Sequence, residues 1–205
     1  MRQKLRPGPQ TGALSLFLLM AFILVHCVAG VGAASAQATR AAKAEPATAP
    51  HVGYGSADLP APVQEMREAI LSAVRSGRIE DLRYAYELNE LKPELAAEPV
   101  ADPVAFWKQI SSDGRGLEVL AALGQILESG WVALPTGRDL ENNRIYVWPY
   151  FAELPLADIT PPQQVELLRL IGTGQGRELA AKGRYCYWRI AIGADGVWHS
   201  FLKMP

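Results

Sequence analysis

Residues 185–202 read YCYWRIAIGADGVWHSFL, and this stretch decides the class of fold. Asp195-Gly196 is a strong signal for a tight hairpin turn, and β-branched and aromatic residues flank it on both sides. A two-residue loop would place Ala194 opposite Val197, Ile192 opposite His199 and Ile190 opposite Phe201. The sequence therefore predicts an antiparallel C-terminal hairpin.

Alternation along the two strands divides their side chains between two faces. We expect the core face to carry Cys186, Trp188, Ile190, Ile192, Val197, His199 and Phe201. The opposite, more amphipathic face carries Tyr185, Tyr187, Arg189, Trp198 and Ser200. A slip of one residue would exchange the faces, so this assignment depends on the length of the turn.

Helical patterns occupy the chain upstream of the sheet-forming half. A first apolar stripe stops at Gly77, and a second helix follows at once and ends before Pro93, which predicts an αα-hairpin. The two stripes consist of Val63, Met66, Ile70 and Val74, then Ile79, Leu82 and Tyr86. Asp102-Pro103 opens a third helix, and a fourth runs from Gly116 to Ser129 with Gly130 at its C′ position.

The remaining elements are two strands and a late helix. Residues 131–134 and 144–148 have strand composition, and Thr160-Pro161-Pro162-Gln163 fits a capping box that opens a helix with Val165, Leu168 and Ile171 on its inner face. We interpret the glycines of 172–176 as a linker after that helix. Helices first and strands later predict an α+β domain over 61–205: an αα-hairpin plus two more helices packed on a small antiparallel sheet of three to five strands that ends in the C-terminal hairpin.

The N-terminal end has the three zones of a secretory signal. Three basic residues precede an almost wholly apolar run, and small residues follow with two overlapping A-x-A sites, Ala34-Ser35-Ala36 and Ala36-Gln37-Ala38. We expect residues 1–36 to be a cleaved signal and the rest to be periplasmic. The alternative is an uncleaved inner-membrane anchor over residues 12–34, because the uncharged run approaches the length of a membrane span.

Composition limits the classes of partner. Residues 37–60 are rich in Ala and Pro and are predicted to form a disordered tether. All 21 Asp and Glu residues follow the signal, whereas three of the 20 Lys and Arg residues lie inside it, so the exported part is net acidic. This charge lacks the basic footprint of a nucleic-acid binder, and we expect no nucleic-acid partner.

Cys186 is the only cysteine beyond the signal, and it therefore cannot form an internal disulfide. We expect it to be a small buried hydrophobic residue in a strand, with a reactive or intermolecular thiol as the alternative. No His, Cys, Asp or Glu spacing typical of a metal site occurs, and no nucleotide motif occurs, so we expect no metal and no cofactor.

His199 is the candidate catalytic residue. A general base needs an orienting carboxylate and a nucleophile within reach, and Glu153 or Asp195 could supply the carboxylate of an envelope hydrolase. The other interpretation is a histidine held on a strand face by a backbone carbonyl.

The segment YVWPYFAE at residues 146–153 is the candidate ligand-binding site. Aromatic side chains with a few polar groups are typical of grooves that bind a sugar, a peptide or a small apolar ligand. The candidate ligand-binding residues are Tyr146, Trp148, Tyr150, Phe151, Glu153 and Arg144, with Arg138 nearby. The alternative is that the rings fill the core against Trp107 and Trp188.

Three runs between Trp148 and Leu202 carry a resemblance to a family: WPYFAE, TPPQQVEL and YWRIAIGADGVWHSF. They resemble small exported proteins of Gram-negative bacteria, a family without an assigned function. The resemblance covers a quarter to a third of the chain, implies a periplasmic location and transfers no catalytic residue.

The sequence therefore favours a non-catalytic binding or interaction module of the cell envelope. Its partner is an envelope protein or a small ligand, and membrane contact is expected only if the N-terminal segment stays uncleaved. The alternatives are the hydrolase built on His199 and an accessory subunit anchored in the inner membrane.

Overall fold

A computed structural model describes residues 50–136 and 143–205, and it confirms the α+β class. The strands are β1 (Val52–Gly53), β2 (Trp131–Pro135), β3 (Arg144–Trp148), β4 (Trp188–Gly193) and β5 (Trp198–Lys203). The α-helices are α1 (Ala61–Ser76), α2 (Leu82–Glu87), α3 (Pro103–Ile110), α4 (Leu117–Leu127) and α5 (Pro161–Lys182). Short 3-10 helices are η1 (Ile79–Asp81), η2 (Tyr150–Ala152) and η3 (Leu156–Asp158).

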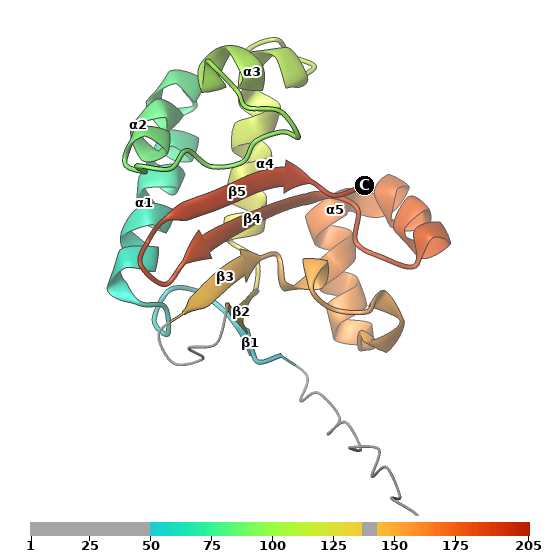
Figure 1. Ribbon diagram of the computed structural model, residues 1–205. Helices are drawn as coiled ribbons and strands as arrows, with labels where there is room; N and C mark the ends of the chain where they lie inside the picture. The colour runs from blue at the N-terminus through green and yellow to red at the C-terminus, as the bar shows by residue number, and fades with distance from the viewer. Residues whose placement is uncertain (1–49, 137–142) are drawn as a thin grey trace, which may run out of the picture. The chain divides into compact units, whose positions relative to one another are not determined.

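The sheet has five strands in the order β1-β2-β3-β4-β5, and every neighbouring pair is antiparallel (Figure 1). One row of large side chains crosses three strands, because Trp148 lies opposite Ile190 and Ile190 lies opposite Phe201. These three side chains are at most 1% exposed. The predicted antiparallel sheet with a C-terminal hairpin is thus confirmed.

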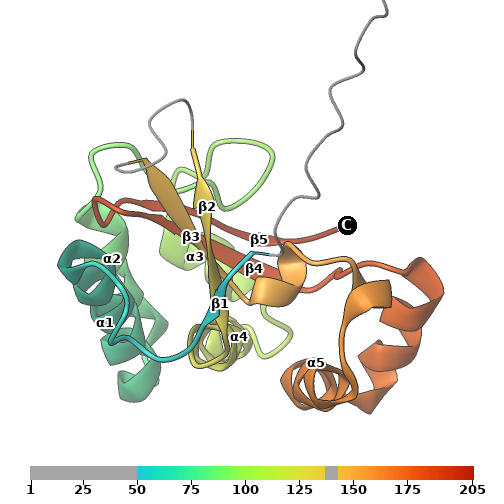
Figure 2. The ribbon, with the colours of Figure 1, turned by 90° about the horizontal axis from the view of Figure 1, so that it is seen from below.

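The helices lie on one side of the sheet, with α1 and α4 beneath it and α5 next to α4 (Figure 2). Helix α1 ends where Gly77 adopts a left-handed φ of 65°, and η1 and α2 follow directly, which confirms the αα-hairpin. Arg67 on α1 donates from Nε and Nη2 to the carbonyl oxygen of Leu127, at 3.1 and 2.8 Å. The guanidinium therefore caps the negative end of α4 and fixes it to α1.

The predicted register of the hairpin is wrong at the turn. The loop contains three residues, not two, because Gly193 pairs with Val197 and Gly196 adopts a left-handed φ of 85°. A β-bulge then restores the predicted pairing of Ile190 with Phe201. Between turn and bulge, Ile192 lies opposite Trp198 instead of His199.

This shift reverses the predicted faces of Trp198 and His199. Trp198 is fully buried and stacks on Trp107 of α3, with ring centroids 6.3 Å apart and an interplanar angle of 11°. His199 is exposed. The physical reason is that the bulge gives β5 one extra residue, which leaves its regular place in the sheet and turns outward.

A buried asparagine stabilises the bulge. The side-chain oxygen of Asn89 accepts the backbone N–H of Trp198 at 2.7 Å, and its amide donates to the carbonyl oxygens of Ala85 and Tyr86 at the end of α2. Asn89 is only 3% exposed, so these partners are needed to satisfy its polar atoms away from water. The residue thereby joins α2 to the hairpin.

The N-terminal boundary of the folded domain lies earlier than residue 61. Val52 and Gly53 form β1 and pair with Val132 and Trp131, although the tether was predicted to extend to residue 60. Gly53 allows this pairing because a Cβ there would lie 2.2 Å from the Trp131 indole. The earlier part of the predicted tether, 37–49, lies outside the described residues.

Gly130 serves a different purpose from the predicted helix cap. Helix α4 ends at Leu127 with Glu128 as a right-handed C-cap, and Gly130 is not among the glycines with positive φ. A Cβ at Gly130 would lie 2.7 Å from the ring of Tyr150 and 2.9 Å from that of Tyr54. The position therefore needs glycine for close ring packing, not for backbone conformation.

Replacing Asn89 by Ala should lower the free energy of unfolding by about 1–3 kcal/mol, because the Trp198 N–H would stay buried without a partner. Urea denaturation measures the change. Glu90→Ala, at the exposed neighbouring position, is the matched control and should change stability by less than about 0.5 kcal/mol. Equal stability of the two variants would contradict the role given to Asn89.

Candidate functional site

The four aromatic residues of the predicted ligand site are core residues. Tyr146 is 6% exposed, and Trp148, Tyr150 and Phe151 are fully buried. The ring of Trp131 packs against Tyr146 and Trp148, with centroids 5.4 and 6.4 Å away. The four rings therefore belong to the core, as the alternative interpretation expected. Their aromatic partners differ from the expected Trp107 and Trp188: Trp131 contacts Tyr146 and Trp148, and Tyr150 packs against Phe151.

Two of the predicted polar companions, Arg144 and Glu153, lie within the described residues and at different ends of the aromatic segment. Arg144 lies at the exposed start of β3, at the other end of the strand from Trp148. Glu153 follows η2 and forms an ion pair with Arg189, with its Oε1 2.8 Å from Nη2 and 2.9 Å from Nε. Arg138 lies outside the described residues.

The structure brings His199 close to a carboxylate. A Cβ at Gly193 would lie 2.8 Å from His199 Nε2 and 2.5 Å from Asp195 Oδ1, so both groups converge above this glycine. Asp195 Oδ1 already accepts the backbone N–H of Val197 at 3.0 Å. Ser200, the neighbouring hydroxyl, is buried. The imidazole of His199 and the carboxylate of Asp195 are thus close together, and the hydrolase hypothesis remains a prediction.

A hollow of about 550 Å³ opens beside His199. The loop from Lys92 to Val100 forms its other wall, and Glu94 pairs with both flanks of Ser200 through its backbone. The ammonium group of Lys92 donates to the carbonyl oxygen of Asn89 at 2.6 Å, so it is engaged in capping α2. This hollow is mixed in polarity, and it offers two exposed glutamates, Glu94 and Glu98.

Cys186 is buried at 7% exposure and is not bonded to another cysteine. It precedes β4 in the chain and packs as part of the hydrophobic core. Cys186 is therefore a small buried residue of the core, as the sequence predicts.

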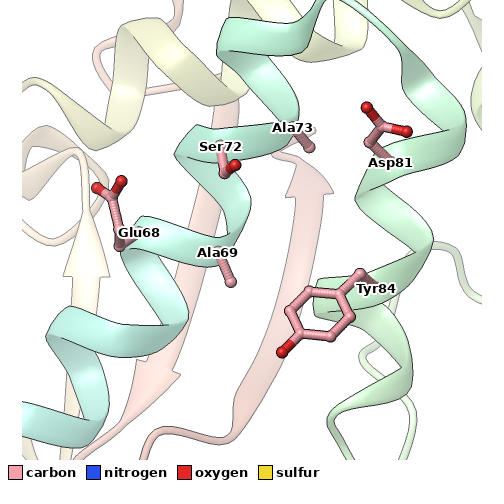
Figure 3. A pocket seen from close by; sticks show the side chains of 6 residues that line it. All are labelled: Glu68, Ala69, Ser72, Ala73, Asp81 and Tyr84. Atoms are coloured by element: carbon pink, nitrogen blue, oxygen red, sulfur yellow. The ribbon is translucent and has the colours of Figure 1, made fainter.

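A second hollow, of about 490 Å³, lies between α1 and α2 (Figure 3). Its floor consists of small residues, and the exposed ring of Tyr84 stands at its side. The two carboxylates at its rim are neutralised locally, since Glu68 pairs with Arg75 and Asp81 pairs with Arg78. The groove therefore has neither a charge preference nor a large apolar surface.

The apolar hollow of the described chain lies along α5 and measures about 470 Å³. We call it the α5 groove. It is bounded by η3, by the first half of α5 and by the second half of the same helix. Its lining residues are Leu156, Ala157, Ile159, Gln164, Leu167, Leu168, Gly176, Leu179 and Gly183.

The α5 groove exists because α5 is broken. Gly172 has φ 77° and ψ 158°, a conformation that is essentially confined to glycine, and the helix resumes after it. The predicted linker over 172–176 is therefore a single-residue kink inside a longer helix. The two helical halves that meet at Gly172 provide opposite walls.

The inner face of α5 also differs from the predicted one. Val165 and Leu168 are 59% and 41% exposed, whereas Leu167 and Leu170 are buried. Ile171, the third predicted residue, is buried as expected. The sequence pattern fitted two stripes of similar strength, and it could not say which one meets the domain. Leu168 consequently presents its side chain to the groove instead of the core.

Among the lining side chains that the structure describes, Gln164 is the one polar group of the α5 groove, and its amide donates to the carbonyl oxygen of Ile159 at 3.4 Å. The remaining lining side chains are aliphatic or absent. A ligand segment in this groove would therefore gain from burial of hydrocarbon and would find few hydrogen-bond partners.

A carboxylate with two tyrosines lies behind the groove wall. Glu166 Oε2 accepts the hydroxyls of Tyr54 at 3.0 Å and Tyr150 at 2.9 Å. Burial, followed by the neighbouring tyrosine and Glu166, raises the pKa of Tyr150, and burial is also the main cause of the raised pKa of Tyr54. Both phenols consequently stay protonated and act as donors at physiological pH.

Comparison with known proteins adds no family. No family model, curated protein or solved structure matches the chain. The resemblance to exported Gram-negative proteins therefore stays a prediction. Within residues 50–136 and 143–205, no group of three or more His, Cys, Asp or Glu residues is placed to hold a metal ion.

Replacing Gly172 by Ala should lower the free energy of unfolding by about 1–3 kcal/mol, because an L side chain is strained in this backbone conformation. No atom lies within 4 Å of the added Cβ, so the loss would come from the backbone alone. Gly174→Ala is the matched control at a helical position with open space around the Cβ. This substitution should raise the free energy of unfolding by up to about 1 kcal/mol. A gain of stability in both variants by urea denaturation would rule out the kink.

Proposed function

We propose that the protein is an exported binding module of the cell envelope that holds a hydrocarbon chain in the α5 groove. The observation that carries the proposal is the lining of this groove. Five leucine and isoleucine side chains line it, and Gln164, the one polar group among its described lining residues, is already hydrogen-bonded. The volume of about 470 Å³ falls in the usual range for small-molecule sites.

The chemistry of the groove points to an acyl chain. A sugar or a polar peptide needs several convergent hydrogen-bond groups, whereas the described lining residues of the groove offer the Gln164 side chain alone. An aliphatic chain needs only apolar surface, and each buried CH₂ contributes about 0.8 kcal/mol. In an envelope compartment, lipids and lipid-modified proteins are the sources of such chains.

The N-terminal segment supports the location. The A-x-A sites after the apolar run favour export, and the acidic exported part fits a module outside the cytoplasm. In the described part of the chain, no helix has the length and apolar character that a membrane crossing requires. The anchored alternative concerns residues 12–34, and the mass of the mature protein separates it from a chain that begins at Gln37 or Thr39.

Replacing Leu168 by Asn should weaken binding of dodecanoate about tenfold, because the substitution removes an aliphatic wall and adds an unpaired amide. Isothermal titration calorimetry with the purified protein measures the dissociation constant. Dodecylammonium should bind with similar affinity, since the groove recognises the chain and not the head group.

Val165→Asn is the matched control, because Val165 is exposed on the same helix and does not line the groove. It should bind dodecanoate as the unsubstituted protein does. The proposal fails if the unsubstituted protein binds neither twelve-carbon amphiphile, or if both asparagine variants bind equally well.

A further inference from the structure

The first half of α5 is fastened to the segment through which the N-terminal 49 residues enter the domain. Tyr54 directly follows β1, and its hydroxyl donates to Glu166 on α5 at 3.0 Å. Tyr150 of η2 donates to the same carboxylate oxygen at 2.9 Å. The rings of Tyr54 and Tyr150 meet edge to face, with centroids 6.2 Å apart. We call this cluster the tyrosine strap.

The strap holds the helix half that forms one wall of the α5 groove. Glu166 lies next in sequence to the lining residues Leu167 and Leu168, and helical spacing directs it to a different side of the helix. A second attachment comes from Gln125 of α4, whose amide donates to the carbonyl oxygen of Arg169 at a long 3.4 Å. The two bonds to the Glu166 carboxylate, at 2.9 and 3.0 Å, are therefore the stronger polar attachment of this wall.

The opposite wall begins after a hinge. Gly172 separates the two halves of α5, and its conformation leaves open space around the Cβ position. The two halves also touch, since a Cβ at Gly176 would lie 2.5 Å from Leu168 Cδ2. The angle between the walls therefore depends on this contact and on what each half is fastened to. A change in the attachment of the first half changes the width of the groove.

The other end of the strap is held by few contacts, one of which is the bond from the Trp131 indole to the carbonyl oxygen of Gly55 at 3.1 Å. Strand β1 consists of two residues and pairs with β2 only at Val132 and Trp131. Tyr54 itself is 55% exposed. A small displacement of this entry segment can therefore break the Tyr54–Glu166 bond without disturbing the buried sheet.

We propose that the tyrosine strap couples the N-terminal entry segment to the α5 groove. With the strap in place, the first half of α5 is held against the domain and the groove grips its hydrocarbon ligand. When Tyr54 leaves Glu166, the half-helix turns about Gly172 and the ligand dissociates. Coupling is reciprocal, so an occupied groove holds β1 and Tyr54 more firmly. This inference rests on the proposed function for the identity of the ligand.

Tyr54→Phe tests the strap, because it removes one hydroxyl and keeps the ring contact with Tyr150. Hydrogen exchange of the purified protein should become at least threefold faster in residues 161–171 and stay unchanged in β4. The dissociation constant for dodecanoate should rise about tenfold. Tyr84→Phe is the matched control on an exposed tyrosine of the α1–α2 groove and should change neither quantity (Figure 3).

Two more measurements separate coupling from a structural role. Adding dodecanoate should slow exchange at Gly53 and Tyr54 in the unsubstituted protein, which a merely stabilising contact would not do selectively. Glu166→Gln keeps an acceptor oxygen and should retain most of the affinity for dodecanoate. Glu166→Ala removes the acceptor of both tyrosines and should lose at least as much affinity as Tyr54→Phe.

The outcomes distinguish the two proposals. Absence of dodecanoate binding to the unsubstituted protein overturns the proposed function, and the exchange rates of residues 161–171 still test the strap. The strap is overturned if Tyr54→Phe leaves those rates unchanged, or if it accelerates exchange equally throughout the domain while dodecanoate affinity stays the same.

Discussion

The hydrogen bond from the Trp198 backbone to the Asn89 side chain is the interaction on which the arrangement of helices and sheet depends. It lies at a β-bulge, where the regular ladder cannot satisfy every backbone group. With this bond in place, Trp198 enters the core and stacks on Trp107, so the last hairpin is joined to α2 and α3 at one point. The same bulge turns His199 out of the sheet and places it beside a hollow.

The domain combines a tightly filled centre with a more open periphery. The sheet and α4 enclose fully buried rings and allow no ligand space among Trp148, Tyr150 and Phe151. The α5 groove is a different kind of structure, because its two walls come from one helix broken at a glycine. A binding function therefore belongs at the periphery, where the Glu166 bonds add a polar attachment to a helix that contributes only one face to the core.

The helix ends could be predicted from the sequence because short local motifs specify them. Gly77, Asp102-Pro103 and the capping box at Thr160 each specify a helix end by themselves, and the structure has helices at all three. The hairpin was predictable in kind but not in register, since Asp-Gly serves both two-residue and three-residue loops. The bulge depends on Asn89, which is distant in sequence, and no pattern within the hairpin indicates it.

The candidate site was harder to predict for a similar reason. A cluster of aromatic residues indicates either a groove or a core, and only the partners decide between them. For Trp148 the deciding partner is Trp131, on a neighbouring strand. The α5 groove could not be predicted once the glycines of 172–176 are interpreted as a linker. In the structure Gly172 is a kink, and the helix resumes after it.

Nuclear magnetic resonance of the hairpin tests the central claim most directly. The account predicts cross-strand contacts between Ile192 and Trp198, together with a slowly exchanging Trp198 amide held by Asn89. It also predicts that His199 has no partner of its own on β4. Contacts between Ile192 and His199, with a rapidly exchanging Trp198 amide, would contradict the bulge and the placement of Trp198 in the core.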